Sequence, residues 1–456
     1  MTSISELSED LIYYISLYFE RDIYALHSLN LVSRKFHHAT RALLFRHINC
    51  ISAEPEALLS RSLHEVPELK THIRSYFLCL NEGTLNHGRL REVLNYPHIE
   101  ELSFTRFDKL RGGTGGFMDV LRPIMLRLRE GRDSQRDFEC AFLDDYALKQ
   151  IRKVNLTGDF TTTELIRFVL LPNVTRMSAT YLNIMKEPRL PIQYAHVKST
   201  LTSLDILGGS LWRISASTMR TILSFCPHLR SLRCQVPMQT LLNSHTEQTC
   251  SVTEPVSPGE LTEVFYPIRK TLQKLSLLNL RHRVPYDGSC MDLSCFSALE
   301  DLEFTSCCLL PPGPPCPKRD AISCLLPKSL RRLKLEFPRE SGILYHHEEG
   351  EPFISQDPHN VSASRYGWIL PLLQSKAELL PNLTEISMVD PPGSLNRCYW
   401  QSARWMLPDE IQEACEIGGL KLDVRISYPK PGSSSPTLAS KGYINRAEAY
   451  AHSYEQ

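Results

Sequence analysis

The hexapeptide LEDLEF at residues 299–304 carries the pattern that decides the fold: an apolar residue, two others, an apolar residue, one other and a last apolar residue. Clear variants stand before and after it, LQKLSL at residues 272–277 and LRRLKL at residues 330–335. The last two apolar residues of each copy are two positions apart, which is the spacing of one face of a β-strand. Each copy therefore predicts a short strand with one buried face.

The same pattern returns along most of the chain. The other copies, clear and weak, are Leu201-Leu204-Ile206, Leu229-Leu232-Cys234, Leu383-Ile386-Met388, Ile73-Tyr76-Leu78, Ile99-Leu102-Phe104, Ile151-Val154-Leu156 and Val174-Met177-Ala179. The ten copies start 23 to 53 residues apart, and two of the gaps are close to twice the shortest ones, as expected if a degenerate copy or a long insertion lies inside each. Such self-similarity indicates one structural unit repeated many times.

A helix-like apolar run precedes many copies and ends at a proline. These prolines are Pro97, Pro172, Pro227, Pro327 and Pro381. Proline cannot continue a helix and favours extended geometry in the residue before it, so each unit is predicted to contain a helix, a stop and a strand. Upstream, Thr163 and Ser217 are predicted to cap two of these helices.

The repeats resemble leucine-rich repeats, and the copy Leu299-Leu302-Phe304-Cys307 fits their longer consensus. The resemblance implies an α/β fold: an irregular solenoid over residues 51–428, with parallel strands on the concave face and helices on the convex face. An ordinary α/β protein whose strands happen to share the pattern is the alternative. Residues 429–456 are rich in Ser, Pro and Gly and are predicted to be a flexible tail.

Residues 1–50 have a different organisation. Apolar residues recur at helical spacing from Leu7 to Leu44 and predict three short helices, with Ser8 and Asp22 as N-caps of the first two. A module of this size buries little core by itself, so part of its apolar surface is expected to bind a partner.

This module resembles an F-box, in the form common in fungal F-box proteins. The matching segments are LSEDL at residues 7–11, RDI at 21–23, LVSRKF at 31–36, ATR at 39–41 and LLFR at 43–46. The family usually carries proline where this chain has serine, directly after the first leucine. The resemblance implies docking onto the Skp adaptor and, through it, onto the cullin of a cullin-RING ubiquitin ligase. A helical cap for the repeats is the alternative.

Six residues of the module are the candidates for adaptor binding: Leu7, Ser8, Leu11, Ile15, Val32 and Phe36. Each of them is also a plausible core residue of the three helices. The sequence does not separate the two roles for any single residue.

The residues between the apolar anchors of each strand point away from the core and are the candidate surface for a target protein. Strands about 4.8 Å apart would place Lys274 beside Asp301, Asp301 beside Arg332, and Glu303 beside Lys334. Both a salt-bridged ladder and a binding surface fit this arrangement. The candidate target-binding residues are Asp205, Arg233, Lys274, Glu303, Arg332 and Lys334. Irregular insertions at residues 244–259, 311–317 and 338–360 are further candidates.

Other functions have little support in the sequence. The 51 basic and 51 acidic residues balance, so no global charge attracts nucleic acid or membranes. No apolar run is long enough to span a bilayer, and the acidic start of the chain is unlike a signal peptide. The glycine run at residues 112–116 lacks the Lys and Ser/Thr of a P-loop, and the cysteines at 290–324 lack zinc-ligand spacing.

Together these features predict a non-enzymatic, cytoplasmic or nuclear protein without cofactor or metal. The leading hypothesis is the substrate-recognition subunit of an SCF-type ubiquitin ligase, with an F-box that binds the Skp adaptor and repeats that bind a protein substrate for degradation. The alternative is a non-catalytic leucine-rich-repeat scaffold with no role in ubiquitin ligation. An enzyme hidden in the repeats is a remote third hypothesis, since no Ser nucleophile elbow or Cys-His constellation with recognisable spacing is present.

Overall fold

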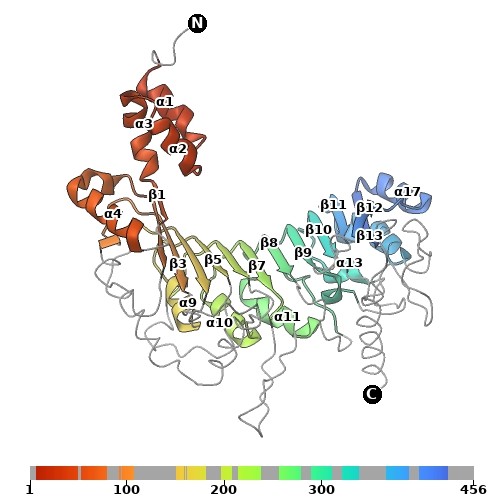
Figure 1. Cartoon of the computed structure of the whole chain (residues 1–456). Helices are drawn as coiled ribbons and strands as arrows, with labels where there is room; N and C mark the ends of the chain where they lie inside the picture. The colour runs from red at the N-terminus through yellow and green to blue at the C-terminus, as the bar shows by residue number, and fades with distance from the viewer. Residues whose placement is uncertain are drawn as a thin grey trace. The chain divides into compact units, whose positions relative to one another are not determined.

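The structure is a computed structural model (Figure 1). It describes residues 7–49, 53–79, 92–93, 95–106, 150–158, 160, 162–180, 197–207, 214–237, 256–278, 289–310, 321–337, 366–389 and 400–429. The predicted tail beyond Pro429, the glycine run and nearly all of the predicted insertions lie outside these ranges. The chain forms two compact units: one holds the described residues up to Ile214 together with Phe225–His228, and the other holds Ser215–Ser224 and those from Leu229 onward.

The N-terminal module consists of the three predicted helices, α1 (Glu9–Leu17), α2 (Ile23–Asn30) and α3 (Arg34–Leu44). The two predicted N-caps are confirmed: the Ser8 hydroxyl accepts a hydrogen bond from the amide of Leu11 at 3.3 Å, and the Asp22 carboxylate accepts one from the amide of Ala25 at 3.0 Å. These bonds satisfy amides that a helix start leaves without an intrahelical acceptor.

Six strands of the first unit follow one another in chain order, and each pairs in parallel with the next. They are β1 (His47–Asn49), β2 (Ser75–Cys79), β3 (Glu101–Arg106), β4 (Lys153–Gly158), β5 (Arg176–Thr180) and β6 (Ser203–Leu207). The second apolar residues of five predicted copies lie opposite one another along this series, and none is more than 2% exposed. They are Tyr76, Leu102, Val154, Met177 and Leu204.

The helical elements that follow the module in this unit are α4 (Ala53–Glu65), the 3-10 helix η2 (Pro67–Thr71) and α9 (Thr162–Val169). The ring of Phe168 on α9 lies 5.1 Å from that of Phe104 on β3, centre to centre, so α9 covers the buried face of the strands. The opposite face of the strands carries the polar residues.

The second unit repeats this arrangement. In parallel order it contains β7 (Ser231–Gln235), β8 (Lys274–Leu278), β9 (Asp301–Thr305), β10 (Arg332–Glu336), β11 (Glu385–Val389) and β13 (Lys421–Pro429), while β12 (Trp400–Arg404) pairs antiparallel to β13. The equivalent buried row is Leu232, Leu275, Leu302, Leu333 and Ile386, again at most 2% exposed.

The helices of the second unit are α10 (Ala216–Ser224), α11 (Pro258–Phe265), α13 (Ile322–Leu325), α15 (Ile369–Gln374), α16 (Lys376–Leu379) and α17 (Asp409–Gly418), with 3-10 turns η4 (Tyr266–Ile268) and η5 (Ser306–Cys308). Figure 1 shows α10, α11 and α13 on one side of the strands of this unit. Both units are therefore mixed α/β stacks of mostly parallel strands, roughly solenoid-like.

All ten predicted strand copies are strands in the structure, but the two predicted caps in the repeats are wrong. Helix α10 begins at residue 216, and the hydroxyl of Ser215, rather than that of Ser217, accepts the capping hydrogen bond from the amide of Thr218 at 3.1 Å. Thr163 lies inside α9, which begins at Thr162. A capping residue precedes the first helical residue, so an error of two positions in the start moves the cap.

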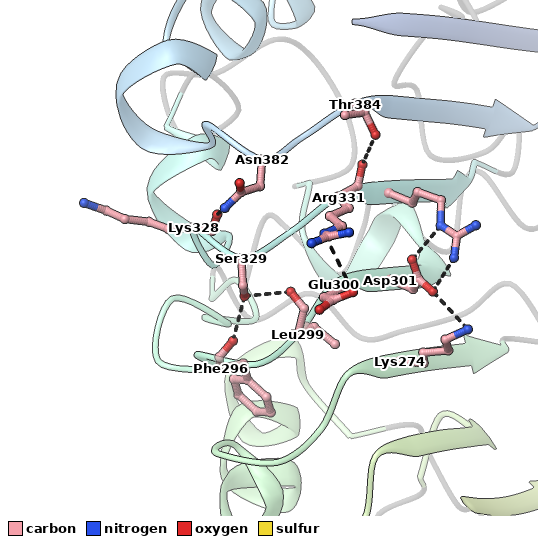
Figure 2. A network of polar contacts seen from close by, with 11 residues as sticks. Lys274, Phe296, Leu299, Glu300, Asp301, Lys328, Ser329, Arg331, Asn382 and Thr384 are labelled. Carbon is pink, nitrogen blue, oxygen red and sulfur yellow. Dashed lines mark hydrogen bonds and ion pairs between the residues drawn. The ribbon is translucent and has the colours of Figure 1, made fainter.

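Backbone hydrogen bonds lock each strand start to the preceding repeat. The carbonyl of Glu300 accepts bonds from the amides of Arg331 and Arg332 at 2.8 and 3.0 Å. The hydroxyl of Ser329 adds a bond of 2.7 Å to the carbonyl of Leu299 (Figure 2). This linkage fixes the register of neighbouring strands and therefore the positions of their outward side chains.

Candidate functional site

Two surfaces are candidates for function, and the first is an exposed apolar surface on the N-terminal module. We call it the helical surface; it consists of Leu11, Tyr14, Ile15, Tyr18, Phe19, Ile23, Tyr24, Leu31 and Val32, which are 39 to 90% exposed. They lie on α1, on α2 and in the turns that follow each of these helices. Leu11, Tyr14, Ile15 and Tyr18 follow helical spacing and so share one side of α1 and its C-cap. Exposed apolar residues that gather in this way mark interaction sites in soluble proteins, and tyrosine is enriched among interface residues that contribute most to affinity.

The module cannot bury these residues because its small core is already filled. Ile12 of α1 packs with Phe36 and Ala39 of α3, and Leu7 and Leu29 lie against this cluster. Ile12 and Ser16 form the buried side of α1, and Tyr13 and Leu17 beside them are half-buried. The side of α1 that carries Leu11, Tyr14 and Ile15 therefore stays exposed.

The six predicted adaptor-binding residues divide between surface and core. Leu11, Ile15 and Val32 belong to the helical surface, whereas Phe36 is 5% exposed and Leu7 is half-buried against the core cluster. Ser8 is exposed, with its hydroxyl engaged in the cap of α1.

The backbone at Ser8 is compatible with proline, the residue usual at this position in the F-box pattern that the module resembles. Its φ is −67°, close to the value of about −65° that a proline ring imposes. Serine adds a capping hydroxyl at the start of α1.

The sequence pattern did not single out the tyrosines Tyr14, Tyr18 and Tyr24 or the leucine at position 31, which are among the most exposed apolar residues of the helical surface. One signal was available. The first helix has apolar residues on all sides, more than one facing helix covers. Which of them remain exposed depends on how α3 packs.

The second surface is the polar face of strands β7 to β13, where charged residues of opposite sign lie on neighbouring strands. The register places Lys274, Asp301, Arg332, Glu385 and Lys421 opposite one another, and we call this series the first row. Lys274 Nζ lies 3.3 Å from Asp301 Oδ2, and Lys421 Nζ lies 2.9 Å from Glu385 Oε1. Arg332 donates two hydrogen bonds of 2.6 Å to the two carboxylate oxygens of Asp301. Figure 2 shows Asp301 beside Lys274.

The next outward position of each strand forms the second row, which consists of Arg233, Ser276, Glu303, Lys334, Ser387 and Asp423. Glu303 accepts hydrogen bonds from Lys334 and, at 2.9 Å, from the hydroxyl of Ser276. Asp423 pairs with two arginines, Arg404 on β12 at 3.2 Å and Arg425 on β13 at 3.1 Å.

Neighbouring cations lower the pKa of two carboxyl groups, one in each row. The hydrogen bond from Arg332 is the main cause that lowers the pKa of Asp301, and Lys274 adds to it. Burial alone would raise the pKa of Glu303, but the bonds from Lys334 and Ser276 and the charges of Lys334 and Arg233 outweigh it, so the pKa lies below its usual value. Asp301 and Glu303 are therefore charged at neutral pH.

The three neighbour pairs expected from strand spacing are present: Lys274 with Asp301, Asp301 with Arg332, and Glu303 with Lys334. Of the predicted target-binding residues, five lie in the two rows of the second unit, whereas Asp205 lies on β6 of the first unit. The sequence pattern did not predict Arg404, Asp423 and Arg425, because it assigns no strand to residues 400–404 or 421–429.

No protein-family model matches the chain, and a search of curated proteins finds no match. Among the described residues there is no group of three or more His, Cys, Asp or Glu side chains placed to hold a metal ion. The helices in the described ranges are all too short or too polar to cross a bilayer.

Proposed function

We propose that this protein is the substrate-recognition subunit of an SCF-type ubiquitin ligase, with α1–α3 as the F-box and the strand repeats as the target-binding part. The observation that carries the proposal is the helical surface. Nine apolar residues with Leu11, Ile15 and Val32 among them stay exposed on a module whose segments resemble an F-box.

In this role the helical surface binds a Skp adaptor, which links the chain to a cullin. The apolar side chains leave water on binding, and their burial supplies the affinity. Leu7 and Phe36 contribute by holding α1 against α3, since both pack in the core of the module. The function places the protein in the cytoplasm or the nucleus.

The repeats then hold the target while the ligase assembly acts on it. A target held beside the ubiquitin-conjugating enzyme reacts at a high effective concentration, so proximity alone accelerates transfer to its lysines. The chain supplies no catalytic group in this mechanism. Its outward rows on β7–β13 are charged and held in register by strand pairing, which suits a specific docking surface.

The proposal is tested by titrating purified Skp adaptor into the full chain. We expect binding at micromolar concentration or tighter, and we expect Leu11→Asp and Tyr24→Asp each to weaken it at least tenfold by placing a charge inside an apolar interface. Both positions lie in the first turn of a helix, where an acidic residue is favourable, so the module stays folded.

Met406→Asp is the matched control, because Met406 is an apolar residue that is 69% exposed far along the sequence. It should bind like the unmodified chain. A chain that fails to bind the adaptor, or that binds it equally well with and without the two substitutions, is better described as a repeat scaffold without a ligase role.

A further inference from the structure

The strand β12 is the last strand at the C-terminal end of the second unit (Figure 1). Among the described strands it pairs with β13 alone, in antiparallel register, with Arg404 opposite Arg425. The amide of Trp405 donates a hydrogen bond of 2.8 Å to the carbonyl of Val424. Because bonded and non-bonded residues alternate in an antiparallel pair, Ser402 and Arg404 direct their own N–H and C=O groups away from β13.

These outward backbone groups of Ser402 and Arg404, which we call the β12 edge, are open to solvent. Ser402 is exposed, and the side chain of Arg404 is 69% exposed. An edge strand with free N–H and C=O groups is a template for pairing with another extended segment, and a charged side chain on it disfavours indiscriminate pairing. The charge of Arg404 therefore decides which segments fit.

The charges beside the β12 edge are unbalanced. Each cation of the first row has an acidic residue opposite it on a neighbouring strand. Arg404 and Arg425 instead lie directly opposite each other, where like charges are unfavourable. Both contact the carboxylate of Asp423: Arg404 Nε lies 3.2 Å from Oδ1, and Arg425 Nε lies 3.1 Å from Oδ2. Two positive charges thus share one negative charge.

This charge cluster can accept one more carboxylate. The side chain of Asp423 is 19% exposed, whereas those of Arg404 and Arg425 are 69 and 61% exposed, so the guanidinium groups extend beyond the carboxylate into solvent. Arg425 donates one hydrogen bond, from Nε, to Asp423, and a guanidinium carries five N–H donors. A single additional carboxylate would neutralise the cluster, since it contains two arginines and one aspartate.

We propose that the β12 edge binds an extended segment of a target protein as an added strand, with an acidic side chain of that segment paired with Arg404. The backbone groups of Ser402 and Arg404 supply main-chain hydrogen bonds, which hold an extended segment whatever its sequence. The acidic side chain then pairs with Arg404 while Arg425 keeps Asp423 on its own strand. The proposal rests on the proposed function, because it names the kind of segment that a target presents.

A second copy of this chain fits the β12 edge less well than an acidic segment does. The sequence of β12 is WQSAR, which contains no acidic residue. Two copies paired edge to edge through β12 would therefore bring no carboxylate to Arg404. They would add like charges to a cluster that already has an excess of positive charge, and like charges in close juxtaposition disfavour association.

The test measures binding of fluorescent seven-residue peptides to the full chain without adaptor, by anisotropy at low salt. The first peptide has a central Glu between alternating Val and Thr residues, and the second has Gln in place of Glu. The third is the first peptide with every backbone amide methylated. We expect the Glu peptide to bind about two- to fivefold more tightly than the Gln peptide, the effect of one exposed ion pair. The methylated peptide should show no binding, because it cannot donate main-chain hydrogen bonds.

Two variants separate the backbone contribution from the charge. Ser402→Pro removes an outward N–H but keeps the bonds between β12 and β13, and it should weaken both unmethylated peptides at least tenfold. Arg404→Gln should weaken the Glu peptide about two- to fivefold and leave the Gln peptide unchanged. Arg220→Gln is the matched control, since Arg220 also lies in the second unit, is 57% exposed and lies 3.6 Å from Glu263. Thermal unfolding of each variant checks that the fold is kept.

Three results would overturn the proposal: equal binding of the methylated peptide, unchanged binding by folded Ser402→Pro, or an equal loss with Arg220→Gln. Self-association of the chain that Ser402→Pro abolishes would also overturn it, because a second copy would then occupy the edge. No adaptor is present and the helical surface is unchanged, so failure here leaves the adaptor experiment unaffected. Loss of adaptor binding, in turn, leaves the result with the peptides as it stands.

Discussion

Substitutions at Val32 and Phe36 should separate binding from stability, although the two residues lie in the same segment and both are apolar. Val32 is 56% exposed on the helical surface, while Phe36 is 5% exposed in the core. We expect Val32→Ser to weaken adaptor binding without destabilising the module. We expect Phe36→Leu to lower stability slightly and to leave binding unchanged.

The size of the binding effect follows from exposure. Complete burial of a valine side chain is worth about 1.5 to 3 kcal/mol. The exposed 56% that the adaptor can still cover corresponds to about 0.8 to 1.7 kcal/mol, or about a fourfold to eighteenfold rise in Kd. At a surface position the change in free energy of unfolding should stay within about 0.5 kcal/mol. A conservative core change such as Phe36→Leu should cost less than about 1.5 kcal/mol.

The assay combines calorimetric titration of the adaptor with urea unfolding of each variant. Met406→Ser serves as the control for loss of an exposed apolar side chain outside the helical surface. The contrary outcome is that Phe36→Leu raises Kd as much as Val32→Ser while circular dichroism shows both variants folded. In that case the adaptor contacts the core side of α3, and our assignment of the helical surface is wrong.

Four further outcomes are expected. Ser8→Pro should change the free energy of unfolding by less than about 1 kcal/mol in urea denaturation, because loss of the cap is offset by the lower entropy of an unfolded chain whose φ is already fixed. Asp301→Asn should destabilise the chain at pH 7, and the effect should shrink below about pH 4. The lowered pKa of Asp301 means that its carboxylate stabilises the fold, and this stabilisation is lost as the carboxylate is protonated. Urea unfolding of both chains across pH measures the difference. Leu333→Ala should lower the free energy of unfolding by about 2 to 5 kcal/mol, because its side chain is 1% exposed and leaves a cavity. In native labelling at pH 8, exposed Cys324 should react with a thiol reagent, whereas Cys226, whose pKa burial raises to about 12, should react only after denaturant is added.

The strands were predictable because two independent regularities coincide in them. Apolar residues two positions apart select the buried face, and the recurrence of the whole pattern selects the neighbour, so the row Leu275, Leu302 and Leu333 follows from the sequence alone. Once the buried row is fixed, the outward residues are placed as well. That is why the repeat pattern also predicts the ion pairs of Asp301 with Lys274 and Arg332.

Two parallel strands, β13 and β1, escaped prediction for different reasons. In β13 the first anchor position is Gly419, which ends α17 with a φ of +57°. The left-handed conformation there favours glycine, so the apolar residue is absent. In β1 the pattern is present as Phe45, Ile48 and Cys50, but it begins directly after α3, so its first apolar residue reads as the end of the helical spacing. The register of β1 is kept by Ile48, which lies opposite Tyr76.

The exposed part of the N-terminal module could not be predicted for a different reason. Periodicity finds the apolar side of a helix only when the other sides are polar, and α1 has no such contrast. Contact with α3 decides that Ile12 is buried and that Leu11 and Ile15 are not. Which residues of α1 are buried depends on the packing of all three helices, so the sequence of α1 alone does not predict it.

The two candidate surfaces differ in the side chains that they offer to a partner, and this difference links them in one experiment. We expect the adaptor to bury apolar side chains of the helical surface such as Tyr24 and Leu31, and salt does not screen this burial. We expect a target at the first row to pair with exposed charges such as Arg332, whose attraction for opposite charges falls as the Debye length shortens from about 10 Å at 0.1 M salt to about 3 Å at 1 M. Raising the salt concentration should therefore release the target while the adaptor stays bound. Loss of both partners at high salt would mean that the adaptor also binds through charge, contrary to the proposed use of the helical surface.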